Sequence, residues 1–368
     1  MQGIAKKAQA QPQHRFGNLY ELLNEDYLHE CWRDIRKDAA YGVDRVSAQE
    51  YEANLDENIH DLVERLKRKQ YHAKLVRRQY IPKGKGKLRP IGILVVEDKL
   101  LQLAVTRTLQ AIYEQDFLRC SYGYRPNVGA LDAVDWLTIK LQFGRYNFVV
   151  EADIKAFFDN IDHEKLMQML SERIEDGQFL RLIRKWLKAG VLDTDGQVLH
   201  PATGTQQGGI VSPILANVYL HHVLDVWFHQ VVKPRCRGEA CLMRFADDFV
   251  AAFQYQTEAK WFYQELAVRL ALFGLELSPE KTRIIPFRQR RNLGQTSFDF
   301  LGFEFRWGYD RNGKPHVMRR TSRKKLRNSL KLFTEWCRDK RRVKLTDLFP
   351  ELNAKLRGYY NYYGVNGN

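Results

Sequence analysis

The chain is poor in cysteine and contains no long apolar run. Its five cysteines are odd in number and scattered over 368 residues, and the nearest two, Cys236 and Cys241, have no second pair at zinc-ligand spacing. No stretch approaches the roughly 18 continuous apolar residues of a membrane span, and residues 1–15 lack the apolar core of a signal peptide. We therefore expect a cytoplasmic protein with reduced thiols and no membrane partner.

Acidic residues are scarce toward the C-terminus. From Arg311 to Lys344 the sequence has fourteen Lys and Arg against only Glu335 and Asp339, and the whole chain carries a net charge of +15. The positive side chains of such a run repel one another unless phosphates neutralise them. The run therefore predicts a nucleic-acid partner, and ribosomal-type RNA binding is one alternative. Internal repeats and low-complexity linkers are also missing, and only residues 1–16, rich in Gln, Ala and Lys, are predicted to be disordered.

Two adjacent carboxylates, Asp247 and Asp248, interrupt the apolar, strand-like segment Arg244–Val250. On a continuous strand they would point to opposite faces, so we predict a tight hairpin turn that brings them together. Asp153 ends a second strand pattern, Val149–Ile154. Three hard oxygen donors at neighbouring strand ends would hold two divalent ions roughly 3.5–4 Å apart, as in phosphoryl transfer. The alternative is an ordinary solvated turn.

The other segments alternate between helical and strand patterns. Arg77–Pro82 and Leu88–Ile93 flank a Gly/Lys-rich tip and predict a positively charged hairpin. Thr282–Phe287 and Phe298–Phe305 predict a further strand pair, and the glycines of Gly204–Gly209 predict a loop whose backbone can approach a ligand closely. Together with several amphipathic helices, these elements predict an α+β fold.

The order of these segments resembles the reverse transcriptases of the group II intron maturase type, over about residues 17–364. Each motif alone is weak, but their conjunction in one order is specific. The segments that carry the resemblance are Ile81–Ile91, Ser121–Pro126, Glu151–His163, Gln207–Asn217, Arg244–Asp248, Phe300–Phe303 and Leu352–Gly364.

The resemblance implies an RNA-directed DNA polymerase with right-hand architecture, in which an antiparallel palm sheet is joined by fingers and a helical thumb. The implied divisions are a tail at 1–16, an N-terminal extension and fingers at 17–145, a palm at 146–308 and a helical thumb or maturase-like region at 309–368. Its implied partners are an RNA template, a DNA primer, dNTPs and a structured intron RNA in splicing and retrohoming. This mobile-element protein would work in a bacterial-type cell, with nucleoid association and homodimerisation left open. We expect the tyrosines of Tyr359–Tyr363 to pack the thumb onto the palm rather than stack on nucleic acid.

The resemblance also assigns roles to single residues. Asp153, Asp247 and Asp248 would be catalytic and would bind two Mg²⁺ ions, or Mn²⁺ as a substitute, with the carbonyl of Ile154 as a further ligand. The residues implied in dNTP binding are Lys83, Arg89, Phe158, Gln207 and Lys281. Phe157 competes with Phe158 for the position against the sugar, and Lys281 has the alternative of being merely exposed. From the charge of the basic stretch, the residues predicted to bind nucleic acid are Arg319, Arg320, Arg323, Lys324, Lys325 and Arg327.

The sequence departs from the family pattern in three places. Gln206 stands where proline is usual, and Phe245 replaces a tyrosine and so lacks only a hydroxyl. No endonuclease site of the His/Asn/His or paired-cysteine type is recognisable, so we do not expect this chain to cut a second target strand. Two other interpretations remain: an RNA-binding splicing factor with an unused polymerase site, or a related reverse transcriptase recruited to CRISPR spacer acquisition or phage defence. The intact carboxylates favour a polymerase, because stability alone would not keep like charges together.

Overall fold

The computed structural model describes residues 1–84, 87–205, 207–288, 296–365 and 368, with the side chains of residues 83–87 outside this set. Its internal contacts divide the chain into two compact units. The first unit comprises Met1–Arg119, Lys155–Val226 and Arg269–Glu276, and the second comprises Cys120–Ile154, Trp227–Val268 and Leu277–Asn368. None of the helices within these ranges is both long and apolar enough to span a bilayer.

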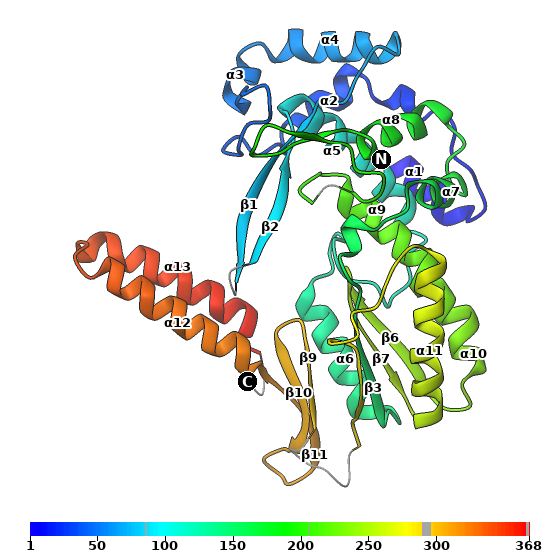
Figure 1. Ribbon diagram of the computed structural model, residues 1–368, viewed down its shortest axis with the longest axis vertical. Coiled ribbons are helices and arrows are strands. Elements are labelled where there is room, and N and C mark those ends of the chain that lie inside the picture. Colours follow the sequence, from blue (N-terminus) through cyan, green and yellow to red (C-terminus); the bar gives the residue numbers. More distant parts are fainter. Residues whose placement is uncertain (85–86, 206, 289–295, 366–367) are drawn as a thin grey trace. The chain divides into compact units, whose positions relative to one another are not determined.

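The first unit is mostly helical and is built around helix α5 (Val96–Tyr113), which is buried along most of its length. Helices α1, α2 and α9 pack against it. Its four strands lie in the order β2-β1-β4-β5, and β1 and β2 form the predicted antiparallel hairpin (Figure 1). The other elements of this unit are α1 (Gln2–Ala10), α2 (Glu25–Trp32), α3 (Ala48–Ala53), α4 (Leu55–Lys67), β1 (Val76–Gly84), β2 (Lys87–Ile93), α7 (His163–Ser171), α8 (Gly177–Leu187), β4 (Val191–Leu192), β5 (Val198–Leu199) and α9 (Ser212–Leu220).

The second unit contains an antiparallel sheet in the order β6-β7-β3-β8 and a smaller sheet in the order β11-β10-β9. One apolar core joins helix α6 to both sheets through side chains such as Leu137, Val250 and Phe305. This mixture of helices and antiparallel sheets confirms the predicted α+β class. Its elements are α6 (Ala130–Phe143), β3 (Phe148–Asp153), α10 (Lys233–Arg235), β6 (Ala240–Phe245), β7 (Asp248–Phe253), most of α11 (Gln256–Leu272), β8 (Arg283–Pro286), β9 (Ser297–Phe300), β10 (Phe303–Tyr309), β11 (Pro315–Thr321), α12 (Arg323–Lys340) and α13 (Leu345–Tyr363).

The predicted disorder of residues 1–16 is wrong. Helix α1 forms there and buries Ala8, and the chain that follows it wraps around the buried guanidinium of Arg173. That guanidinium also lies 2.8 Å from a carboxylate oxygen of Asp116. Alanine-rich sequence favours helix, and a buried cation requires acceptors, here the backbone carbonyls of an otherwise featureless segment. Arg173 donates to the carbonyl oxygens of Gln11, Pro12 and His14.

The strand pair predicted between 282–287 and 298–305 is also wrong. Strand β8 joins the larger sheet beside β3, whereas the segment 298–305 turns back on itself at Leu301–Gly302 and becomes β9 and β10. The start of the basic stretch, predicted as part of a helical thumb, is strand β11, paired with β10. The Asp310 carboxylate accepts hydrogen bonds from the amides of Asn312 and Lys314 and so stabilises the hairpin turn.

The domain boundaries predicted at 145/146 and 308/309 describe functional lobes rather than compact units, and they stay predictions.

Beyond β11 the chain is helical as expected. Helices α12 and α13 form a helical hairpin (Figure 1). The Lys340–Glu351 ion pair at 2.9 Å and the Lys355 ammonium, 5.3 Å from the Trp336 ring centroid, connect the two helices.

Replacement of Arg173 tests its role as the anchor of the N-terminal segment. In Arg173→Met the Asp116 carboxylate and the acceptor carbonyls lose their partner, so we expect the free energy of unfolding to fall by roughly 2–3 kcal/mol. Hydrogen exchange at residues 2–16 should rise. Arg181→Met, at an exposed residue whose side chain donates to the Gly177 carbonyl, is the matched control. Unchanged exchange at residues 2–16 in Arg173→Met would contradict the anchoring role.

Candidate active site

The predicted hairpin turn between the two aspartates is present. Strands β6 and β7 are antiparallel with Phe245 opposite Asp248, which leaves Ala246 and Asp247 as a two-residue loop. On the other side of β7, Asp153 at the end of β3 lies directly opposite Asp248. Residues in this relation have Cβ atoms about 4.5–5.5 Å apart and project from the same face of the sheet. The register therefore brings Asp153 and Asp248 together, with Asp247 in the adjoining turn.

The turn is held in a conformation that alanine rarely adopts. Ala246 has φ of 55°, in the left-handed region that is sterically unfavourable for a residue with a Cβ atom. The fully buried Arg244 guanidinium donates to the Ala246 carbonyl at 3.0 Å and to the Ser121 hydroxyl at 2.6 Å. Gly123 lies so close that a Cβ atom there would be 2.2 Å from the Ala246 nitrogen. The contacts of Arg244 and Gly123 fix the position of the turn from its buried side.

Arg244, Ser121 and Gly123 are functional candidates that sequence analysis missed as individual residues. The segment Ser121–Pro126 contributed to the family resemblance, but it carried no assigned role. In the structure its first residues pair with strand β6, since the Tyr122 amide donates to the Arg244 carbonyl at 2.9 Å. An arginine inside an apolar strand pattern was the signal that could have indicated a buried structural cation.

Negative charge predominates in the cluster of the three aspartates. The pKa of Asp248 is raised to about 6, first by the protein that excludes water from its carboxyl group and then by the charges of Asp247 and Asp153. Lys281 and Lys325 act in the opposite direction and lower this pKa.

Lys281 lies in this cluster, where its ammonium contacts Asp153 Oδ2 at 2.7 Å. The ion pair raises the pKa of Lys281. Among the residues that the structure describes, no three Asp, Glu, His or Cys side chains converge at the spacing of a metal site. The carboxylates are thus neighbours without forming a closed ligand set, and Asp153 is engaged by an ammonium. Ile154, the predicted carbonyl ligand, is buried and forms a bridge with Leu277.

The remaining predicted nucleotide-binding residues belong to the first unit. Arg89 is exposed on β2, opposite Ile81, whereas the side chain of Lys83 lies outside the described residues. Phe157 is buried, with its ring centroid 6.5 Å from that of Tyr219, while Phe158 is partly exposed. Phe157 is therefore a core aromatic, whereas Phe158 is only partly buried.

Gln207 lines a cavity of about 200 Å³ in the first unit together with Arg78, Gly92 and Thr205. Its carbonyl oxygen accepts a hydrogen bond from the Gly92 amide at 2.6 Å, which ties the loop to strand β2. The buried Thr205 hydroxyl has no hydrogen-bond partner among the described residues. Close backbone approach, predicted from the glycines of this loop, is present where a Cβ atom on Gly208 would lie 2.4 Å from the Gly92 carbonyl oxygen.

The six basic residues predicted to bind nucleic acid fall into two groups. Arg319 and Arg320 lie on β11 and form ion pairs, with Asp135 and with Glu304 respectively. Arg323 is 78% exposed at the start of α12 and lies 3.9 Å from Glu304. The others are exposed on α12 and are Lys324, Lys325 and Arg327.

Two of the C-terminal tyrosines pack as expected. The Tyr362 hydroxyl donates to the Leu301 carbonyl at 2.7 Å, and the ring centroids of Tyr362 and Tyr363 lie 5.6 and 5.3 Å from that of Phe303. Tyr360 is instead 63% exposed. The base of the helical hairpin is thereby attached to the turn between β9 and β10.

Replacement of Gly123 tests the support beneath the Ala246–Asp247 turn. A Cβ atom in Gly123→Ala would meet backbone, so we expect a loss of about 1–3 kcal/mol in unfolding free energy and faster hydrogen exchange at residues 244–249. The control is Gly358→Ala on α13, where nothing lies within 4 Å of the added atom. Urea denaturation and exchange mass spectrometry measure both effects. Equal unfolding free energies and equal exchange rates in the two variants would show that the segment around Gly123 does not hold the turn.

Comparison with known proteins gives the family. A family model described as "Reverse transcriptase (RNA-dependent DNA polymerase)" matches residues 81–305. The Group II intron-encoded protein LtrA of Lactococcus lactis subsp. cremoris is 28% identical, over all of this chain and 74% of LtrA. Protein YkfC of Escherichia coli (strain K12) is 31% identical, over 88% of this chain and 92% of YkfC.

Solved telomerase structures are also similar. Telomerase from Candida albicans, in complex with a fragment of telomeric RNA, has a TM-score of 0.48 and 15% identity over 71% of this chain and 49% of the telomerase chain. Telomerase from Candida tropicalis has a TM-score of 0.49 over 63% of this chain and 53% of that one, so this chain spans about half the length of these structures. From the family model and the two curated relatives, the chain belongs to the reverse transcriptase family, the RNA-dependent DNA polymerases, and within it to the group II intron type.

Proposed function

We propose that this reverse transcriptase extends a DNA primer on an RNA template by two-metal nucleotidyl transfer, with Asp153, Asp247 and Asp248 as the catalytic carboxylates. The observation that carries the proposal is the cross-strand position of Asp153 opposite Asp248 beside a turn held in a strained conformation. Like charges directly opposite each other destabilise a sheet, so the arrangement has a chemical use rather than a structural one.

The donor set fits divalent cations. Its ligands would be hard carboxylate oxygens, which suit Mg²⁺, with Mn²⁺ as a substitute, and the carbonyl of Ile154 is a further candidate. The Lys281 ammonium, which binds Asp153, already places one positive charge beside the carboxylates. Bound metal ions would supply activation of the primer 3′-hydroxyl and neutralisation of the triphosphate. Reverse transcriptases in general use divalent metals.

The residues of the chain itself would bind and orient the substrates. We propose that Lys83 and Arg89 on the β1–β2 hairpin bind the triphosphate, and that Phe158 packs against the sugar and excludes a 2′-hydroxyl. Gln207 would line the nucleotide and template pocket. Lys281, once released from Asp153, would neutralise or protonate the departing pyrophosphate. The partial exposure of Phe158 and the exposure of Arg89 support these roles.

We further propose that the protein binds a structured intron RNA and assists its splicing and retrohoming. The name of LtrA, a group II intron-encoded protein, and the exposed basic residues of α12 support this part of the proposal. On α12 the contacts would come from Arg323, Lys324, Lys325 and Arg327, since Arg319 and Arg320 are engaged by carboxylates. A protein that only bound RNA would have no use for the cluster of like charges.

Removal of two carboxylates tests the polymerase directly. We expect Asp247→Ala combined with Asp248→Ala to lower primer extension on an RNA template by about 10³-fold or more, because the metal ligands are lost. RNA affinity should be unchanged. The control is Glu57→Ala combined with Asp195→Ala, two exposed acids in the first unit. Extension by the double mutant at the wild-type rate would refute the site, and tight RNA binding without extension by the wild type would leave an RNA-binding splicing factor.

Neutralising Lys281 tests the competition between its ammonium and a metal ion. We expect Lys281→Gln to bind Mn²⁺ about two- to five-fold more tightly in the absence of nucleotide, since an exposed ion pair contributes roughly 0.2–1 kcal/mol. The same variant should extend primers more slowly. Electron paramagnetic resonance measures free Mn²⁺, and Lys260→Gln on α11 is the control. Unchanged or weaker Mn²⁺ affinity would show that the Lys281–Asp153 pair does not oppose metal binding.

A further inference from the structure

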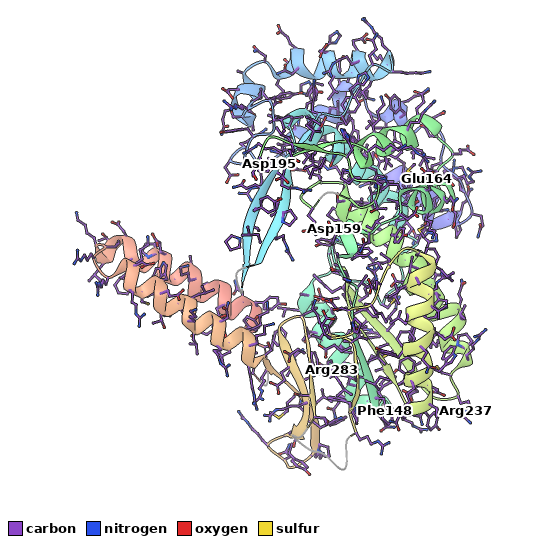
Figure 2. All side chains as sticks on the ribbon, viewed as in Figure 1. Phe148, Asp159, Glu164, Asp195, Arg237 and Arg283 are labelled. Atoms are coloured by element: carbon purple, nitrogen blue, oxygen red, sulfur yellow. The ribbon has the colours of Figure 1, made fainter. Side chains whose placement is uncertain are left out.

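The larger sheet of the second unit has a second distinctive end, opposite the carboxylates. One row of paired residues crosses it there, from Ala240 to Phe253, Phe148 and Pro286. Phe253 is five residues along β7 from Asp248, which corresponds to roughly 17 Å at the rise of a β-strand. Figure 2 shows Phe148 and Arg237 at this same end of the unit. Any site at this end is therefore separate from the carboxylate cluster.

Exposed cations gather at this end, which we call the basic sheet end. Arg145, Lys233 and Arg237 line a hollow of about 510 Å³ together with Tyr146 and Gln254. Two further exposed arginines belong to the same end: Arg235 is the last residue of α10, and Arg288 follows β8. Within the described part of the chain, none of the five cations forms an ion pair. The five are Arg145, Lys233, Arg235, Arg237 and Arg288.

Three of these arginines lie against aromatic rings. The guanidinium carbons of Arg235, Arg237 and Arg288 are 5.8, 5.9 and 5.0 Å from the ring centroids of Trp261, Tyr255 and Phe148 respectively. Such contact restrains a long side chain and leaves its in-plane N–H groups available. A restrained guanidinium loses less conformational entropy when it binds a phosphate in bidentate fashion. The rings therefore prepare these cations for an anionic ligand.

The nearby carboxylates accept hydrogen bonds from backbone amides rather than from the cationic side chains. Glu258 Oε1 accepts hydrogen bonds from the amides of Arg237 and Gly238, at 2.7 and 3.3 Å. Glu239 Oε2 accepts one from the Arg145 amide at 3.1 Å. Both carboxylates thus fix the loops that carry the cations and leave the cationic side chains free of acidic partners. Five cations thus share this end with two carboxylates that bind backbone amides, so positive charge is in excess there.

We propose that the basic sheet end binds the phosphodiester backbone of an RNA at a second site, distinct from the carboxylate cluster. Its cations come from several separate segments, so they suit a chain of phosphates better than one small anion. Exposed aromatic side chains lie beside them: Phe143 is 82% and Tyr255 is 44% exposed. Unpaired bases stack on such rings, which is typical of single-stranded RNA recognition. This inference goes beyond the proposed polymerase function and does not depend on it.

The test is RNA binding by the full chain with four cations neutralised, Arg145→Gln, Lys233→Gln, Arg237→Gln and Arg288→Gln. The probe is a fluorescein-labelled RNA hairpin with single-stranded flanks, followed by anisotropy across a potassium chloride series. We expect affinity to fall about ten-fold or more and the slope of log K against log salt to decrease by roughly 3, about 0.7–0.9 per lost phosphate contact. Extension of a short primer–template should stay within about two-fold, given the separation of roughly 17 Å. The control neutralises four exposed lysines of the first unit: Lys6, Lys7, Lys69 and Lys188.

A second variant separates RNA binding from general attraction to anions and from misfolding. Phe143→Ala keeps every charge and leaves the Tyr255 ring beside Arg237, so we expect it to weaken binding of the hairpin about five-fold or more while heparin binding is unchanged, because only bases stack. Equal salt slopes in the four-cation variant and its lysine control would overturn the proposal. So would loss of binding to anionic lipid vesicles, or to an acidic peptide, without any loss of binding to RNA. The RNA measurement keeps its meaning even if primer extension fails in the wild type.

Discussion

The antiparallel register of β3 and β7 places two like charges directly opposite each other, and the second unit is organised around that unfavourable pair. Asp153 faces Asp248, with Asp247 in the adjoining turn. Lys281 offsets part of the repulsion by contact with Asp153. A fold selected for stability alone would have replaced one of these carboxylates. The arrangement is understandable if cations bind there during function.

Several separate contacts determine the conformation of the turn that carries Asp247. Ala246 adopts a left-handed conformation, Arg244 binds its carbonyl from the buried side, and the absence of a side chain at Gly123 lets its amide approach closely. A strained backbone persists when surrounding contacts over-determine it, and such strain is typical of catalytic sites. The four strands of this sheet all lie within residues 81–305, the part of the chain that the reverse transcriptase family model matches.

Local pattern was enough to predict the hairpin turn, the strand end at Asp153 and the β1–β2 hairpin. Each depends on neighbours in sequence: an Asp-Asp pair inside an apolar run, or a Gly/Lys tip between two alternating segments. Strand β11 was missed because the charge of the basic stretch outweighed the Asn312-Gly313 hairpin signal. Helix α1 was missed because its anchor, Arg173, is more than 150 residues away. Local pattern does not report such contacts.

The same limit applies to the functional surfaces. Sequence charge alone marked Arg319 and Arg320 as ligands for nucleic acid, yet cross-element carboxylates engage both. Conversely, the basic sheet end is assembled from positions 145, 233, 235, 237 and 288, which form no continuous run. Only tertiary structure collects them. Charge counts along the sequence therefore show neither which cations are paired nor which distant cations lie together.

The central claim is that Asp153, Asp247 and Asp248 hold a pair of divalent ions. The most direct measurement is electron paramagnetic resonance of the protein loaded with Mn²⁺, primer–template and a non-hydrolysable dNTP. The account predicts two bound ions with the exchange coupling of a pair roughly 3.5–4 Å apart, and loss of that coupling in Asp248→Ala. Two uncoupled ions, or a coupled pair that survives in Asp248→Ala, would contradict it.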